Sequence, residues 1–125
     1  TKMEYVAIII KVFIFFSIVN VWFFRFNKPT SWRGGQAENM KKEFEIYGLS
    51  ETMLYIVGGL KVLAATLLVV SIWVPQLVYP AAAVTALLMA GAIAMHIKVK
   101  DPVQKSFPAF SFLVLSLVLV LFNTL

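Results

Sequence analysis

The fold is decided by residues 51–73, ETMLYIVGGLKVLAATLLVVSIW. After Glu51 this run carries a single charge, on Lys61. About 20 helical residues at 1.5 Å each cover the roughly 30 Å of bilayer hydrocarbon, so the run is long enough to cross a membrane. Ser50 is a suitable N-cap, and the helix dipole favours Glu51 in the first turn. We therefore expect a transmembrane helix here.

Three further runs of this kind extend along the chain. The spans are predicted at about residues 5–24, 51–73, 78–97 and 106–125. Hydrophobic residues make up 61% of the 125 residues, against roughly 45–50% in soluble domains, and a small soluble domain could not hide so much apolar surface. The sequence predicts an all-α integral membrane protein, a single transmembrane domain over residues 1–125. We expect a four-transmembrane-helix bundle with the lipid bilayer as its main partner.

A polar segment separates the first two spans, and its second half is predicted to form a helix at about residues 36–47. One stripe of that helix is apolar and consists of Ala37, Met40, Phe44 and Tyr47. Such a short amphipathic helix is typical of the headgroup plane of a membrane. Gly48 is expected to end it, because glycine accepts the left-handed conformation of a helix C-terminus. We therefore expect an interfacial helix between spans 1 and 2.

Positive charges are distributed unevenly over the predicted topology. The loops between spans 1 and 2 and between spans 3 and 4 together contain Arg25, Lys28, Arg33, Lys41, Lys42, Lys98, Lys100 and Lys105. The opposite side has only Lys2. Cytoplasmic loops carry such an excess, so both long loops are predicted in the cytoplasm and both termini outside. The same rule explains the formal net charge of +5, and no nucleic-acid partner is expected.

Cysteine is absent from the sequence, and histidine occurs once. These counts exclude disulfides and thiol redox chemistry, and with no carboxylate in any span they predict no metal site. The single histidine also lacks a carboxylate within the spans to orient it as a catalytic base. Catalytic residues are therefore unknown, no cofactor is evident, and we do not expect this chain to be an enzyme on its own.

Lys61 is the most informative residue of the sequence. It lies about 16 Å along the second span, where a charge costs about 2.5–3.5 kcal/mol on insertion scales. Gly58 and Ala65, at i−3 and i+4, indicate that its helix face is closely packed. A neutral amine, a water-filled cavity, or an anionic or carbonyl-bearing ligand would each offset the cost. The alternative is a structural lysine that donates hydrogen bonds to backbone or serine oxygens.

The candidate site extends to residues of the other spans. The ligand-binding candidates are Lys61, His96, Gly58 and Tyr47, with Lys11, Ser17 and Asn20 as secondary candidates. His96 is either a hydrogen-bonding residue at the membrane surface or a proton-exchanging group. Ser17 and Asn20 are either interhelical hydrogen-bond partners or part of the site. The stem of Lys11 is expected to snorkel toward the membrane surface.

Short motifs in the second and third spans resemble a known family. They are Tyr47-Gly48-Leu49-Ser50, Val57-Gly58-Gly59-Leu60-Lys61, Tyr79-Pro80-Ala81-Ala82, Leu88-Met89-Ala90-Gly91-Ala92, and Met95-His96-Ile97-Lys98-Val99-Lys100-Asp101-Pro102. Together they are similar to the DoxX family, in particular its DoxX-like branch, over nearly the whole chain. The resemblance implies a small four-helix protein of the bacterial inner membrane. It also implies a link to membrane redox chemistry, because some relatives are linked to thiosulfate:quinone oxidoreduction. Many members carry a glutamate where this chain has Lys61, whereas His96 matches the family position.

The preferred functional hypothesis is a small-ligand-binding or accessory subunit in quinone-linked membrane redox metabolism. The ligand would be a quinone or a lipid, held between the helices near Lys61 and His96. Three alternatives stay open at this point: a component of a quinone-coupled oxidoreductase, a small transporter, and a purely structural subunit. A larger membrane complex or a homo-oligomer would be the protein partner.

Overall fold

The computed structural model describes residues 2–125, and four helices in this part of the chain are long and apolar enough to cross a membrane. They are α1 (Lys2–Val19), α3 (Glu51–Val70), α4 (Val78–Lys98) and α5 (Phe107–Thr124). Short turns of helix extend three of them: η1 (Asn20–Phe24) after α1, η2 (Pro75–Leu77) before α4 and η3 (Val103–Ser106) before α5. The predicted all-α fold with four membrane spans is confirmed.

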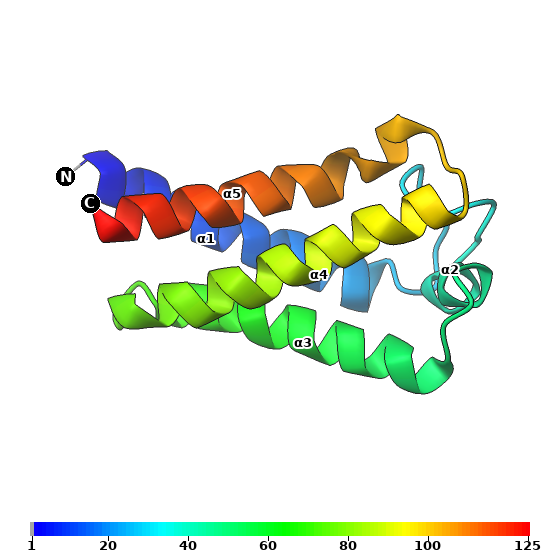
Figure 1. Cartoon of the computed structure of the whole chain (residues 1–125). Helices are drawn as coiled ribbons and strands as arrows, with labels where there is room; N and C mark the ends of the chain where they lie inside the picture. The colour runs from blue at the N-terminus through cyan, green and yellow to red at the C-terminus, as the bar shows by residue number, and fades with distance from the viewer. Residues whose placement is uncertain (1) are drawn as a thin grey trace.

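The four long helices form a bundle in which α1 and α4 each pack against both α3 and α5. Both termini lie at one end of the bundle, and α2 (Met40–Ile46) lies at the other (Figure 1). We call this second end, which contains residues 25–50 and 99–106, the loop end. Large apolar side chains such as Phe16, Leu87 and Leu117 are exposed on the outside of the bundle. In a membrane, this surface faces lipid.

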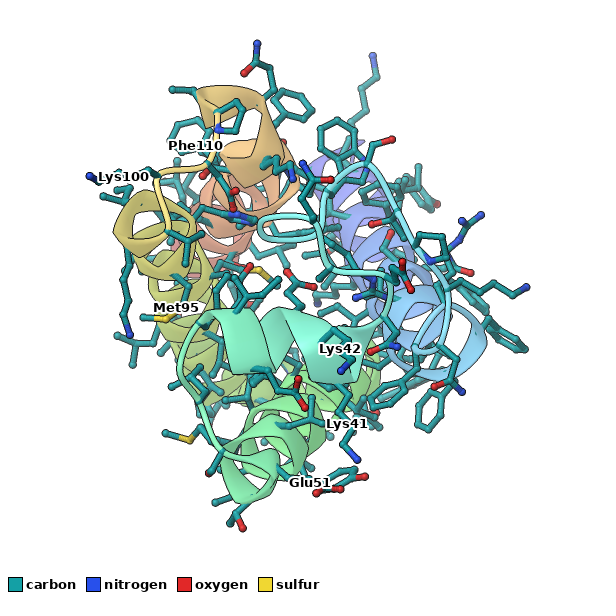
Figure 2. The ribbon with its side chains drawn as sticks, turned by 90° about the vertical axis from the view of Figure 1, so that its right-hand side faces the viewer. Lys41, Lys42, Glu51, Met95, Lys100 and Phe110 are labelled. Atoms are coloured by element: carbon teal, nitrogen blue, oxygen red, sulfur yellow. The ribbon has the colours of Figure 1, made fainter. Side chains whose placement is uncertain are left out.

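The helix α2 is shorter than predicted, because the chain before Met40 is not helical. Asn39 is extended and caps the helix, and its side-chain oxygen accepts a hydrogen bond from the Lys42 backbone at 2.8 Å. The predicted apolar stripe exists, but it packs on protein: Met40 and Phe44 belong to the same buried cluster as Trp22. Figure 2, which views the loop end, shows α2 lying across it. The helix therefore closes the end of the bundle with its apolar face, which is not free to face lipid.

Two helices end in the same hydrogen-bond motif with different residues at the left-handed position. After α2, Gly48 has φ of 79°, and the backbone N–H of Leu49 donates to the carbonyl of Phe44 at 2.9 Å. After α4, Lys100 has φ of 59°, and the N–H of Asp101 donates to the carbonyl of His96 at 2.9 Å. Both are Schellman caps. Gly48 ends its helix as the sequence predicts.

Exchanging the residue type at these two caps should have opposite effects on stability. Lys100→Gly is expected to raise the free energy of unfolding by about 1 kcal/mol, because a left-handed conformation costs an L-residue about that much. Gly48→Ala is expected to lower it by a similar amount for the same reason. Unfolding in mixed detergent micelles measures both. A Lys100→Gly protein no more stable than the parent would contradict the prediction.

Candidate functional site: a cavity at the loop end

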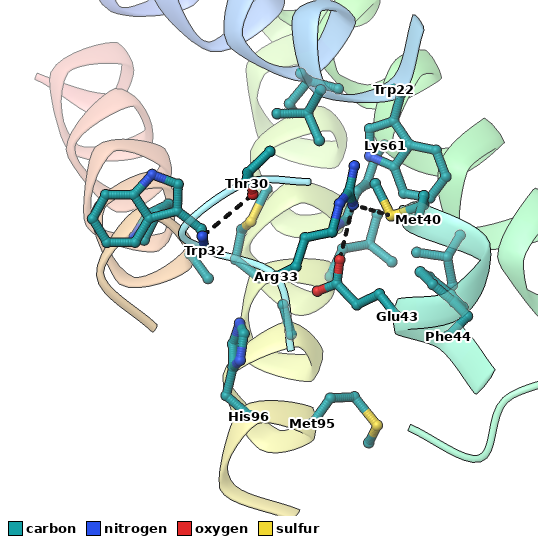
Figure 3. A pocket seen from close by; sticks show the side chains of 18 of the residues that line it. Trp22, Thr30, Trp32, Arg33, Met40, Glu43, Phe44, Lys61, Met95 and His96 are labelled. Carbon is teal, nitrogen blue, oxygen red and sulfur yellow. Dashed lines mark hydrogen bonds and ion pairs between the residues drawn. The ribbon is translucent and has the colours of Figure 1, made fainter. Parts of the chain in front are cut away.

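A cavity of about 890 Å³ lies between the helices toward the loop end. All four long helices, α2 and the segment between η1 and α2 contribute to its wall. Apolar side chains form most of the lining, as is usual for sites of small ligands. The polar side chains facing it include Arg33, Glu43, Tyr47, Lys61, His96 and Asn20. Figure 3 shows this space from close by.

The structure brings five of the seven candidate residues to this one cavity. Lys61, His96, Tyr47, Ser17 and Asn20 all line it. Gly58 is buried beside the cavity without lining it, and Lys11 lies elsewhere on α1, only 6% exposed. Ser17 and Asn20 therefore share a cavity with Lys61, although they lie on a different helix. The expected snorkelling of Lys11 stays a prediction.

Lys61 lies over the indole ring of Trp22. Its Nζ is 5.6 Å from the ring centroid, a distance at which the negative face of the ring attracts a cation. Gly58, one turn before Lys61, makes room for the ring, because a Cβ there would lie 2.6 Å from Trp22 Cε3. Trp22 belongs to the π-helical turn η1, and such turns occur often at functional sites. The sequence predicts that Gly58 lies on a closely packed helix face, and the structure shows that the Trp22 indole packs against this glycine.

A buried ion pair between Arg33 and Glu43 forms the wall beside Lys61. Arg33 Nη1 lies 3.0 Å from Glu43 Oε1, and the two side chains are 3% and 12% exposed. The guanidinium also donates to the backbone carbonyl of Lys28 through Nε at 2.8 Å and to that of Arg25 through Nη2. Arg33 thereby ties the loop before α2 to the end of the bundle.

Neither partner of this ion pair was a candidate from the sequence. Arg33 counts there as one of the loop charges, and no acid in a span suggests a carboxylate near Lys61. The available signal was the position of Glu43, three residues after Met40 and four before Tyr47, which puts it beside the apolar stripe of α2. The cavity wall therefore does contain a carboxylate, supplied by α2 instead of a membrane span.

Tyr47 is hydrogen-bonded to the same carboxylate. Its hydroxyl donates to Glu43 Oε2 at 2.6 Å, and the backbone N–H of Gly34 donates to that oxygen at 3.0 Å. Burial, followed by the negative charge and hydrogen bond of Glu43, raises the pKa of Tyr47 above its ordinary value of 10.0. Tyr47 is therefore a neutral phenol at physiological pH. Its ring also meets the His96 ring edge to face at 6.0 Å.

His96 has a carboxylate partner that lies just beyond its helix. Its Nδ1 is 2.7 Å from Asp101 Oδ2, and the two side chains are 7% and 5% exposed. Asp101 Oδ1 also accepts the backbone N–H of Gly35 at 2.9 Å. Lys105 Nζ donates to the carbonyl of Gly35 at 2.5 Å. The segment before α2 is thus tied to the α4–α5 connection.

Burial by itself would raise the pKa of Asp101, but its hydrogen-bond partners outweigh this effect. The hydrogen bonds from His96 and the Gly35 N–H, with the charge of Lys105, hold the pKa below its ordinary value of 3.8. Asp101 is therefore an anion at neutral pH. No carboxylate within the spans orients His96 in the sequence, because Asp101 lies beyond the end of α4 and reaches the His96 ring only where the cap at Lys100 turns the chain back.

Among residues 2–125, the structure contains no cluster of three or more His, Cys, Asp or Glu side chains that could hold a metal ion. The polar groups of the cavity suit an organic ligand with oxygen atoms: donors on Lys61 and a histidine ring held by Asp101.

The fold and the cavity together define a class: a small multi-pass membrane protein with a cavity between its helices. A comparison with protein families shows which family within that class this chain belongs to. The model of the DoxX-like family matches residues 12–120, which is most of the chain, and this protein belongs to that family. No curated protein and no solved structure matches the chain.

Proposed function

We propose that this protein is a ligand-binding or accessory subunit in quinone-linked membrane redox metabolism, and that its cavity binds a quinone ring. One observation carries the proposal: a single cavity has Lys61, His96 and the ring of Trp22 at its wall. A quinone is a flat apolar ring with two carbonyl oxygens. Such a ring needs apolar walls and a few well-placed donors, which this cavity offers.

The sizes and charges of the cavity support the same ligand. A volume of about 890 Å³ lies within the roughly 300–1,000 Å³ typical of small-ligand sites. Arg33 is paired with Glu43, whereas the ammonium of Lys61 meets the face of Trp22. Lys61 is therefore the cation best placed to donate to a carbonyl oxygen. The redox chemistry would belong to the bound quinone and not to a side chain of this protein. The electrons for the quinone would therefore come from a partner protein.

Equilibrium binding of decylubiquinone to the purified protein in lipid nanodiscs tests this proposal. We expect Lys61→Met to weaken binding by about tenfold or more, because a hydrogen bond from a charged donor contributes about 1.5–3 kcal/mol. Lys11→Met is the matched control: it removes a lysine that also lies in a spanning helix but does not line the cavity. Its affinity should equal that of the parent protein.

Two outcomes would overturn the proposal. One is absence of decylubiquinone binding by the intact protein. The other is an equal loss of affinity in the Lys61→Met and Lys11→Met proteins, which would indicate a general effect of buried lysines on the bundle. Extraction of the protein purified from its native membrane supplies an independent observation, because a quinone should be recovered with it.

We further propose that the loop end faces the cytoplasm and that the membrane is the bacterial inner membrane. All the Lys and Arg residues outside the predicted spans except Lys2 gather at this end, whereas both termini lie at the other (Figure 1). A cysteine introduced at the exposed position of Glu38 should react with a membrane-impermeant maleimide only after cells are opened. Labelling of this cysteine in intact cells would show that the loop end faces the outside instead.

A further inference from the structure

The two nitrogens of the His96 ring have different surroundings. Nδ1 is bound to Asp101 Oδ2 at 2.7 Å, and Asp101 is itself fixed by the Gly35 N–H at 2.9 Å. Nε2 has no hydrogen-bond partner among residues 2–125. By contrast, every fully buried polar side-chain atom in these residues has a hydrogen-bond partner. Nε2 must therefore reach open space, and the space that His96 lines is the cavity.

This arrangement decides which hydrogen bond His96 can offer to a ligand. An anionic Asp101 accepts a hydrogen bond, so Nδ1 carries the proton of the neutral ring and Nε2 is a bare acceptor. When Nε2 also takes up a proton, the imidazolium becomes a donor toward the cavity, and Asp101 stabilises its charge. The same ring nitrogen thus accepts in one protonation state and donates in the other. Figure 3 shows the ring of His96 at the cavity.

We propose that His96 and Asp101 form a proton-exchange group that distinguishes the oxidised from the reduced form of a quinone in the cavity. The neutral ring accepts the hydroxyl of a quinol at Nε2, and the protonated ring donates to the carbonyl oxygen of a quinone. Uptake of the proton forms one N–H bond at Nε2 and breaks one O–H bond of a hydronium ion, which leaves as water, and no electron moves in this step. Asp101 is the positioning residue. This inference rests on the proposed function and adds the role of each ring nitrogen.

Charged and titratable groups line the cavity together with His96 or are bound to residues next to it. They are Asp101, Lys105, Lys98, Tyr47, Glu43, Arg33 and Lys61. Two of them contact the His96 ring directly: Asp101, whose pKa lies below its ordinary value, and Tyr47, whose pKa lies above it. Both keep their protonation state between about pH 5 and 8, the range in which imidazoles titrate.

The pH dependence of binding tests the proposal, with decylubiquinone and decylubiquinol as the two probes. Raising the pH from about 5 to about 8 should weaken quinone binding by up to about tenfold per pH unit, since one proton is linked to binding. Quinol binding should show the opposite slope, weakening as the pH falls. Asp101→Asn should abolish the difference between the two slopes. Glu38→Gln, at an exposed position outside the cavity, should retain it.

The single histidine of the chain permits a second measurement that needs no ligand. Nitrogen NMR of histidine-labelled protein reports which ring nitrogen carries the proton. We expect the Nδ1–H tautomer in the neutral parent protein and a shift toward Nε2–H in Asp101→Asn.

The possible outcomes separate this inference from the proposed function. An Nε2–H tautomer in the parent protein, or equal slopes for quinone and quinol, would overturn the inference while quinone binding stands. Absence of binding of both probes would overturn the two together. Opposite slopes that survive in Asp101→Asn would show that Asp101 does not position the ring.

Discussion

Replacing Glu43 with methionine should lower the free energy of unfolding by about 3–5 kcal/mol, the usual cost of removing one partner from a buried ion pair. The substitution leaves the Arg33 guanidinium buried without its carboxylate, and Arg33 is only 3% exposed. It also removes the acceptor of the Tyr47 hydroxyl and the Gly34 N–H. Denaturant titration in mixed micelles measures the change.

The same helix supplies the control for this prediction. Glu45 pairs with Lys42 at 3.5 Å, but the two side chains are 55% and 63% exposed. Glu45→Met should therefore cost less than about 1 kcal/mol. The double substitution Arg33→Met/Glu43→Met should cost less than the sum of its parts, because it leaves no unpaired charge. Equal costs for Glu43→Met and Glu45→Met would show that the buried pair contributes little.

Gly58→Ala is the second substitution with a large expected effect. A Cβ at residue 58 would lie 2.6 Å from Trp22 Cε3, so the buried indole must move. Overpacking of this kind costs about 1–3 kcal/mol. It also removes the ring from beneath the Lys61 ammonium, so decylubiquinone binding should weaken in parallel. Near-ultraviolet circular dichroism, which reports the environment of tryptophan, should change with it.

The neighbouring glycine provides a matched control. A Cβ at Gly59 would meet no atom within 4 Å, apart from its own chain neighbours and helix backbone. Gly59→Ala should therefore be neutral or stabilising by up to about 1 kcal/mol, because alanine has the higher helix propensity. The two variants have the same composition and differ by one position. If they are equally stable, the contact between Gly58 and Trp22 does not restrict residue 58.

Local sequence signals predict the elements of this protein well. The apolar runs are long enough to cross a membrane whatever the rest of the chain does, and each becomes a helix. Ser50 caps α3 by accepting the N–H of Met53 at 3.1 Å, and Gly48 ends α2. These features depend on residues within one or two helical turns. They can therefore be recognised without knowledge of the fold.

The candidate site is predicted only in part, for a reason that Lys61 and Arg33 illustrate. Lys61 can be recognised in the sequence as a candidate site residue because it is a charged residue type within an otherwise apolar span. Arg33 and Glu43 look like ordinary loop and surface charges, since nothing local reveals that the end of the bundle encloses them. The amphipathic pattern of α2 likewise predicts an apolar face without telling whether lipid or protein covers it.

The sequence by itself determined the membrane location, the four spans and the residues most out of place within them. Hydropathy and helix capping act locally, and a chain this apolar has few other stable solutions. Only the tertiary structure decided which polar groups meet: Asp101 with Gly35, 66 residues away, and the Lys98 ammonium with the carbonyl of Tyr47, 51 residues away. Those contacts depend on how helix ends and loops meet at one end of the bundle. No periodicity within a helix encodes them.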